Sequence, residues 1–484
     1  MLPVALCIGL FLPQVAAPAQ AAQAAQATST TSAMSTTSNR LALERELAAT
    51  VSEPAMQARV RALVALGPRM GGTSSGARAA TLREKLLRDA GLDVRVVEDG
   101  ERWCHEETRF AVRARRLDDG TELVLARAWP WGYSPSGAGK LALSLEPVEG
   151  GAWLGARFAA KKGAPTPKLA LIDGATTRDG SHPVVHHLKS GDANRTAVFG
   201  LSRDEGATLR AWLSVGAAVE IEWELVSVIA KARARTVVAR LPDASGAHAW
   251  KDDYLLFCAH GDSDAGGPGA DDNASGEAVV IEIASAWAKA VRERKLPPPP
   301  HEVRFAIWGS EIASTREYLE TRVPSEGGLL GVLNYDQAGF GSGADQLNLE
   351  PDDLPANVEL ARVLLAVLED HEGATGFPAR WATNKSLGGT DSYVFSGSKY
   401  CREHARPALT LFTSAWGEPG EHPRTPGMPG ESWRERDHVS VDYDNFYHSA
   451  GDTPENTTDK EPWNMGWCAR VGWLGAARYL EGLK

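Results

Sequence analysis

The chain has 484 residues and a formal net charge of −11 at pH 7. This length predicts two or three domains. With 43% hydrophobic and 23% charged residues, the composition is that of a globular protein. The negative charge argues against a nucleic-acid-binding protein.

The first 40 residues have the composition of an export signal followed by a linker. Residues 2–12 are apolar, and the last of several Ala-x-Ala sites is Ala25-Gln26-Ala27. We predict a signal peptide over residues 1–27, although basic residues do not precede the apolar stretch. A disordered tail or a retained anchor is the alternative. Residues 28–40 are rich in Ser and Thr and predict a linker without packing.

These features predict a secreted or periplasmic protein. No later segment is long and apolar enough to span a membrane. We therefore expect no stable membrane association after the signal is cleaved. Four cysteines would remain, and their spacing leaves the pairing open. Cys258 lies in an apolar run and is predicted to be a buried thiol.

Three further regions follow the linker. Residues 41–120 contain two helical patterns, separated by a Gly- and Pro-rich cluster at 67–73, and then an alternating strand pattern at 92–97. Residues 121–235 contain short alternating strands around a helical pattern at 204–213. This change in the pattern of expected elements predicts a smaller, β-rich inserted domain. The alternative is an extension of the main domain.

The third region, residues 236–484, carries buried strands and helices in alternation. Apolar runs at 254–259, 303–308, 329–335 and 407–413 predict strands, and apolar residues at helical spacing follow the first of them at 279–287. This pattern indicates an α/β fold. A Gly- and Pro-rich stretch at 417–430 is predicted to be a loop that borders the site.

Imidazole and carboxylate side chains stand where these strands end. His260 ends the first strand, and the pair Asp271-Asp272 follows a Gly-rich gap, while the other candidates are Glu311, Asp336 and His448. Such folds place their active sites at the carboxyl ends of strands. These ligand types suit zinc, and a shared carboxylate can hold two metals about 3.5–4 Å apart.

Neighbouring acids suggest supporting roles around these candidates. Asp262 is placed to accept the second N–H of His260, and Asp452 to do the same for His448. Asp271 is expected to orient the loop. Helix capping is the alternative for the Asp271-Asp272 pair. Isolated histidines receive a structural or solvent-facing interpretation, namely His182, His186, His187, His301 and His422.

The motifs resemble those of the zinc-dependent aminopeptidase family that includes bacterial leucyl aminopeptidases, glutamate carboxypeptidase and the transferrin receptor ectodomain. The match covers roughly residues 55–484 and includes His260-x-Asp262-Ser263, the segment 269–276, Asn334-x-Asp336 and the late His448. The resemblance implies a mixed central β-sheet sandwiched by helices. Residues 121–235 are similar to the protease-associated domain that relatives insert to shape or cover the cleft.

The resemblance also implies roles for the site residues. Asp272 would bridge two Zn²⁺ ions, His260 and Asp336 would complete one site, and His448 would belong to the other. The family has two successive glutamates, whereas Ile312 follows Glu311 here. Aligned from the preceding strand, Glu311 is the general base, and aligned backward from Ser314-Thr315 it is a zinc ligand. We favour the base because that alignment has no gap.

A second departure concerns the segment Gly389-Thr390-Asp391-Ser392, where many relatives have Ser-Asp-His. Asp391 is therefore a candidate for substrate binding, and a structural turn is the alternative. The expected function is a secreted zinc aminopeptidase that hydrolyses peptides, with Glu311 and Asp262 as the catalytic residues. A carboxypeptidase or dipeptidase of the same fold, a glutaminyl-cyclase-like transferase and an inactive receptor-like ectodomain are the alternatives.

Overall fold

The computed structural model describes residues 38–158, 163–177, 179–241, 250, 252–263, 266–341, 346–351, 354–383, 389–396, 405–413, 431–432 and 446–483. Its contacts divide the chain into two units, Met1–Leu47 and Ala48–Lys484. The first unit is helical over its described residues 38–47. The predicted signal peptide, most of the linker and the predicted loop at 417–430 lie outside the described residues.

A mixed β-sheet forms the centre of the second unit. Its middle strands β9, β10, β11 and β14 are parallel, whereas β8 runs antiparallel to β10 and β12 runs antiparallel to β14. The strand order is β15 (Glu431–Ser432), β13 (Trp381–Thr383), β12 (Leu347–Glu350), β14 (Ala408–Phe412), β11 (Leu329–Tyr335), β9 (Tyr254–His260), β10 (Glu302–Trp308) and β8 (Val219–Arg240).

The central strand β9 is buried on both faces, as its continuous apolar sequence predicts. Phe257 points to one face, where its ring centroid lies 6.0 Å from that of Trp287 on α5 (Gly276–Arg292). The next residue, Cys258, points to the other face and belongs to a core that includes Phe395 of α8 (Asp391–Ser396). Helices therefore cover both faces, and the predicted α/β sandwich is confirmed.

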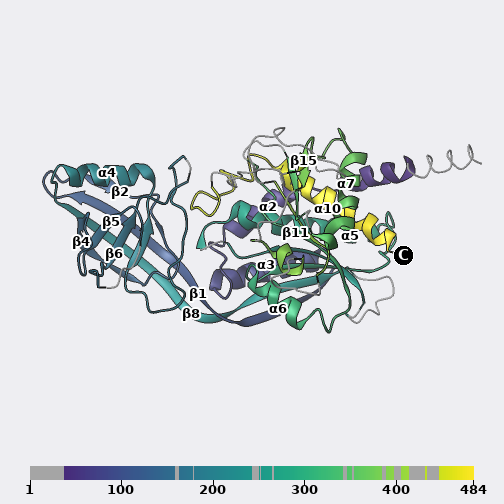
Figure 1. The fold of residues 1–484 in the computed structure, drawn as a ribbon, viewed down its shortest axis with the longest axis horizontal. Coiled ribbons are helices and arrows are strands. Elements are labelled where there is room, and N and C mark those ends of the chain that lie inside the picture. The colour runs from purple at the N-terminus through teal and green to yellow at the C-terminus, as the bar shows by residue number, and fades with distance from the viewer. Residues whose placement is uncertain are drawn as a thin grey trace, which may run out of the picture. The chain divides into compact units, whose positions relative to one another are not determined.

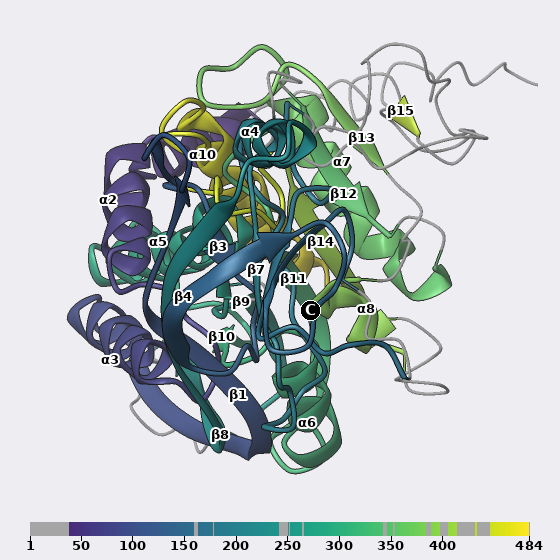
Figure 2. The same cartoon turned by 90° about the vertical axis from the view of Figure 1, so that its left-hand side faces the viewer.

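The helices fall into two groups on the two faces of this sheet (Figure 2). On the first face, α5 packs against β9, β10 and β11, and further helices pack around it: α2 (Glu53–Val64), α3 (Ser74–Asp89) and α10 (Trp463–Gly482), with α7 (Val358–Asp370) against α10. On the other face, α8 packs against β11, β14 and α6 (Ala313–Thr321). A short 3-10 helix, Pro355–Asn357, precedes α7.

A second group of strands has its own apolar core, which includes Leu171, Phe199 and Trp223. Figure 1 shows β1 and β8 as paired ribbons that belong to both groups of strands. The second group comprises β1 (Asp93–Arg116), β2 (Glu122–Val124), β3 (Trp129–Pro130), β4 (Gly137–Ser144), β5 (Ala152–Gly155), β6 (Leu169–Ile172), β7 (Ala197–Gly200) and α4 (Arg203–Ser214). Its assignment as a protease-associated-like insertion stays a prediction.

The cysteines in the described part of the chain are free thiols. Cys104, Cys258 and Cys468 are buried and unpaired with one another. The predicted buried thiol at Cys258 is therefore confirmed, while Cys7 and Cys401 lie outside the described residues. No helix in the described part of the chain combines the length and the apolar composition that a membrane crossing requires.

Trp287 is the side chain on which we test the packing of α5 against the sheet. Replacing this buried residue with Ala leaves a cavity beside Phe257, so we expect Trp287→Ala to lower the free energy of unfolding by about 3–5 kcal/mol. Urea unfolding followed by circular dichroism measures the change. Trp463→Ala is the control, because Trp463 is 40% exposed and its loss should cost far less. Equal losses in the two variants would contradict the packing argument.

Candidate metal centre

The carboxyl ends of three parallel strands bring together His260, Glu311 and Asp336. His260 is the last residue of β9, Glu311 lies three residues after β10, and Asp336 directly follows β11. One ligand atom from each of these side chains lies within 4.8 Å of the others. The strand register explains the meeting, since β9 pairs with both β10 and β11 in parallel.

Asp272 lies between the two candidate histidines. Its Oδ1 is 3.1 Å from His260 Nε2, and its Oδ2 is 3.0 Å from His448 Nε2. Each carboxylate oxygen therefore faces a different imidazole. This is the arrangement that a bridging carboxylate requires, because one ligand then serves two neighbouring sites.

The turn that carries Asp272 is fixed by hydrogen bonds on both sides. This distorted helical turn, Ala270–Ser275, joins β9 to α5. The backbone N–H groups of Asp271 and Asp272 donate to the two oxygens of Asp452, at 2.8 and 3.0 Å. Asn273 donates from Nδ2 to the Tyr335 carbonyl at 2.8 Å, which ties the turn to β11. Asp271 accepts from the Gly339 N–H, in agreement with its predicted loop-orienting role.

The contacts of Asp452 correct one expectation. We predicted that Asp452 accepts the second N–H of His448, because the two residues are close in sequence. The structure instead directs both Asp452 oxygens to the Asp272 turn. Asp452 thus supports the shared carboxylate rather than the imidazole.

His448 is held through its backbone by a distant segment. The Val185 N–H donates to the His448 carbonyl at 2.7 Å, and the Ala450 N–H donates to the Pro183 carbonyl at 3.1 Å. Val184 and Ser449 form an antiparallel bridge between these bonds. The segment 183–185 precedes β7, so it belongs to the second group of strands. Sequence reasoning missed this pairing, since no local pattern links segments so far apart.

Asp262 contacts both His260 and the turn that carries Glu311. His260 Nδ1 lies 3.0 Å from the Asp262 carbonyl and 3.3 Å from Asp262 Oδ1. The same Oδ1 accepts the Glu311 N–H at 2.9 Å. Asp262 therefore lies where it can orient the imidazole and fix the Glu311 backbone at once.

Asp391 lies behind the same turn. It is fully buried, and its Oδ1 accepts the Ile312 N–H at 2.7 Å and the Thr315 hydroxyl. Among the described residues, its Oδ2 has no hydrogen-bond partner. The predicted role of Asp391 in substrate binding stays a prediction. Its contacts are those of a residue that holds the Glu311 turn.

Two buried arginines lie beneath the loop that follows His260. Arg83 pairs with Glu277, with Nε and Nη2 on the two carboxylate oxygens, and also donates to the Gly261 carbonyl. Arg69 donates to the carbonyls of Pro268 and Gly269 at 2.8 and 2.7 Å. The sequence analysis did not single out either arginine. The sequence feature that could have pointed to Arg83 is its position as a charged residue near the apolar face of a predicted helix.

Burial and mutual contact shift the pKa values of the site. Burial alone would lower the pKa of His260, but the Glu311 carboxylate and contacts with neighbouring acids raise it well above its usual value. Burial would raise the pKa of Asp272, whereas hydrogen bonds from His260 and His448 lower it. Burial raises the pKa of Glu311 well above its usual value. In the protein without metal, the acids around His260 therefore favour its protonated form.

The donor set fits a zinc ion. Asp336 Oδ2 accepts the Thr390 hydroxyl at 2.6 Å, while Oδ1 is buried and has no hydrogen-bond partner within the described residues. That oxygen lies 3.5 Å from His260 Nε2. A buried carboxylate oxygen without a partner is costly, and a cation would satisfy it. Imidazole nitrogens and carboxylate oxygens are typical zinc ligands.

Comparisons with known proteins agree with this interpretation. Residues 236–471 match the model of Peptidase family M28. A probable lipoprotein aminopeptidase of Mycobacterium tuberculosis, LpqL, is 34% identical over 108 residues, which are 22% of this chain and 19% of that protein. An aminopeptidase of Pseudomonas aeruginosa is 38% identical over 89 residues, or 18% of this chain and 15% of that protein. The matched segments thus span less than a fifth of these relatives.

Two solved structures share the fold at low sequence identity. The zinc aminopeptidase BSAP of Bacillus subtilis aligns with a TM-score of 0.56 and 16% identity, over 87% of this chain and 94% of that one. A Peptidase M28 precursor from Shewanella amazonensis aligns with a TM-score of 0.57 and 16% identity, over 92% and 97% of the two chains. Both likenesses support the mixed α/β sandwich.

The raised pKa values predict how the stability of the metal-free protein depends on pH. Burial raises the pKa of Asp391 to about 7 and that of Asp452 to about 6. Both values exceed the unfolded value of about 3.9, so the folded state holds protons that the unfolded state releases. The contribution of these two groups to the free energy of unfolding is therefore fully present below about pH 4. It is lost as the pH rises to about 7.

Urea unfolding in the presence of a chelator, between pH 4.5 and 7.5, measures this decline. Asp391→Asn is the control, because it removes one titrating group while its side-chain oxygen can still accept the Ile312 N–H. We expect a shallower decline in this variant. A metal-free stability that is constant or rises across this range would contradict the prediction.

Proposed function

We propose that this chain, whose residues 236–471 match the model of Peptidase family M28, is a zinc-dependent aminopeptidase, which removes N-terminal residues from peptides. The observation that carries the proposal is the position of Asp272, with one oxygen 3.1 Å from His260 Nε2 and the other 3.0 Å from His448 Nε2. A single carboxylate between two imidazoles is suited to bridging two metal ions.

We propose two zinc ions per chain. His260, Asp272 and Asp336 would hold one, and Asp272 and His448 would take part in holding the other. Zinc, when bound, lowers the pKa of a water molecule toward 7 and polarises the carbonyl of the scissile bond. The second site would have fewer carboxylates than in the family pattern, because Ile312 follows Glu311.

Glu311 is proposed as the general base. It is half-buried and stands beside His260 and Asp336. From this position its carboxylate could accept the proton of the attacking water and pass that proton to the leaving amine. Asp262 would fix the position of this carboxylate, because it accepts the Glu311 N–H and faces His260 Nδ1.

A free amino terminus is proposed as the bound end of the substrate, because two of the matching relatives are named aminopeptidases. The buried Arg69 and Arg83 already bind backbone carbonyls and Glu277, so a substrate carboxylate would need another partner.

Replacing Glu311 with Gln tests the general base. We expect Glu311→Gln to lower kcat by about 100- to 10,000-fold, because it removes the proton acceptor. Its zinc content should stay at the wild-type value. Hydrolysis of aminoacyl-nitroanilides and metal analysis of the purified protein measure both quantities. Loss of zinc in this variant would show that Glu311 is a ligand rather than the base.

Two further variants complete this test. Asp272→Asn should release zinc and abolish turnover together, because it weakens the shared ligand. Glu320→Gln is the matched control, since this exposed glutamate lies on α6 nine residues after Glu311 and should change neither quantity. A wild-type protein that binds zinc tightly but hydrolyses no peptide or nitroanilide would refute the enzymatic proposal and support a receptor-like binding role.

Export is a separate part of the proposal and rests on the sequence of residues 1–27. We expect the mature protein to begin after one of the Ala-x-Ala sites, the last of which ends at Ala27. N-terminal sequencing of protein recovered from the culture medium or the periplasm tests this. A full-length chain that retains Met1 and stays in the cytosol would contradict export.

A further inference from the structure

The turn that carries Glu311 has an unusual pattern of backbone hydrogen bonds. Four successive N–H groups, from residue 309 to residue 312, all donate to side-chain oxygens. The acceptors are Thr236 Oγ1 for Gly309 at 3.0 Å, Ser314 Oγ for Ser310 at 2.8 Å, Asp262 Oδ1 for Glu311 at 2.9 Å and Asp391 Oδ1 for Ile312 at 2.7 Å. Side chains thus fix the backbone on both sides of the Glu311 carboxylate.

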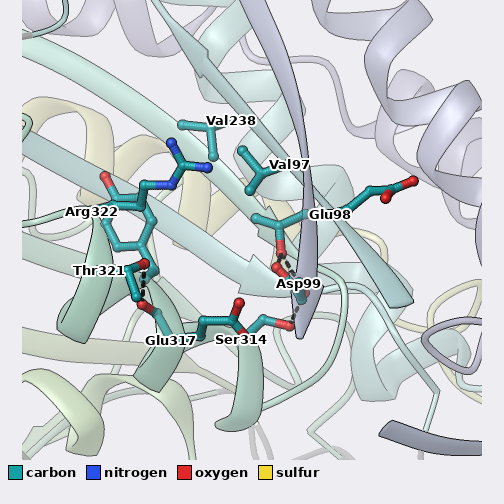
Figure 3. A pocket seen from close by; sticks show the side chains of 10 residues that line it. Val97, Glu98, Asp99, Val238, Ser314, Glu317, Thr321 and Arg322 are labelled. Carbon is teal, nitrogen blue, oxygen red and sulfur yellow. Dashed lines mark hydrogen bonds between the residues drawn. The ribbon is translucent and has the colours of Figure 1, made fainter. Parts of the chain in front are cut away.

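The two hydroxyl acceptors share one further partner, Asp99. Thr236 Oγ1 lies 3.1 and 3.0 Å from the two oxygens of Asp99, and Ser314 Oγ donates to Asp99 Oδ2. A hydroxyl has one proton, so donation to Asp99 turns its lone pairs toward the backbone N–H groups. Figure 3 shows Asp99 and Ser314 side by side, with the hydrogen bond between them.

The local backbone of β1 explains why Asp99 points inward. The pairing of β1 with β8 shifts register here, because Glu98 pairs with Arg235 and Glu101 pairs with Arg233. Two residues of β1, Asp99 and Gly100, therefore stand against a single residue of β8. Such a β-bulge re-aims a side chain. Asp99 lies within this bulge and is only 3% exposed.

The Glu311 turn needs this support because its backbone is strained. Ile312 has φ +54°, a conformation that a β-branched residue rarely adopts. Strained residues persist only when the surrounding structure fixes them. The same bulge holds α6 through Gly100, whose N–H donates to Glu317 at 2.8 Å.

We infer that Asp99 is a positioning residue for Glu311, acting through the hydroxyls of Thr236 and Ser314. The inference deepens the proposed function, since it concerns the alignment of the proposed general base. Without the Asp99 carboxylate, the two hydroxyls lose their common acceptor and can rotate away from the N–H groups of Gly309 and Ser310. The Glu311 carboxylate then occupies a wider range of positions relative to His260 and Asp336.

The contacts from Asp99 through the hydroxyls of Thr236 and Ser314 to the Glu311 turn are called the relay below. Two kinds of variant test it in the zinc-loaded, full-length protein. Asp99→Asn removes the charge and introduces a competing donor, and Thr236→Val removes one hydroxyl at nearly constant volume. We expect the amides of Gly309 and Ser310 to exchange with deuterium at least about tenfold faster in Asp99→Asn, as measured by hydrogen–deuterium exchange. We also expect kcat to fall by about 10- to 100-fold, with KM and zinc content unchanged.

Thr236→Ser is the conservative rescue, because it keeps the hydroxyl. It should restore the exchange rate of Gly309 and the kcat that Thr236→Val loses. Glu317→Gln is the matched control, because Glu317 and Asp99 line the same cavity of about 50 Å³ and Glu317 contacts the same bulge. Glu317 contacts none of the N–H groups from 309 to 312, so its variant should keep wild-type exchange there.

Three results would overturn the inference. The first is unchanged exchange at Gly309 and Ser310 in Asp99→Asn. The second is equal acceleration in Glu317→Gln, which would indicate general loosening of the bulge. The third is wild-type kcat in Asp99→Asn despite faster exchange, because Glu311 would then not depend on the relay. If the wild-type protein were inactive, the proposed function would be refuted. The inference about Asp99 would still be tested, because the exchange experiment does not depend on activity.

Discussion

The carboxylate of Asp272, shared between His260 and His448, is the interaction on which the site depends. A single side chain can face two imidazoles only if its backbone is held from outside. Asp452 supplies this support through two adjacent N–H groups, and Asn273 adds a tie to the end of β11. The parallel strands then place Asp336 on the same edge of the sheet. Sheet and turn together bring the side chains of the proposed metal centre to one place.

Charge balance explains the surroundings of this centre. Several carboxylates are buried there, and burial of charges is costly unless they are paired. Arg83 forms a bidentate pair with Glu277 next to the loop, and Arg69 holds the carbonyls that precede the Asp272 turn. These cations bind the carbonyls of Gly261, Pro268 and Gly269, which lie between the proposed ligands His260 and Asp272 in the sequence.

Much of the fold could be predicted from the sequence because local patterns dictate it. The apolar run that became β9 and the helical spacing of Val279, Ile283 and Trp287 in α5 need no knowledge of distant segments. The meeting of His260 with Asp336 also followed, since both end parallel strands. The free thiol at Cys258 was predicted on the same ground.

The remaining features depend on contacts between residues far apart in the chain. Asp452 was assigned to His448 because sequence proximity was the only guide, whereas in space it supports the Asp272 turn. Asp99 lies more than 200 residues before Glu311 and stands in a β-bulge of β1. No periodicity signals such a bulge. The choice between base and ligand for Glu311 likewise depends on a turn whose strain the sequence does not reveal.

The pairing of residues 183–185 with the segment around His448 has a consequence for how this protein can fail. One ligand of the proposed centre takes its backbone partner from the β-rich group of strands rather than from the main sheet. Damage far from the acidic cluster, such as a proteolytic nick near Pro183, would then free that ligand while every strand end stayed in place. Integrity of the β-rich group is in this sense a condition for assembling the site.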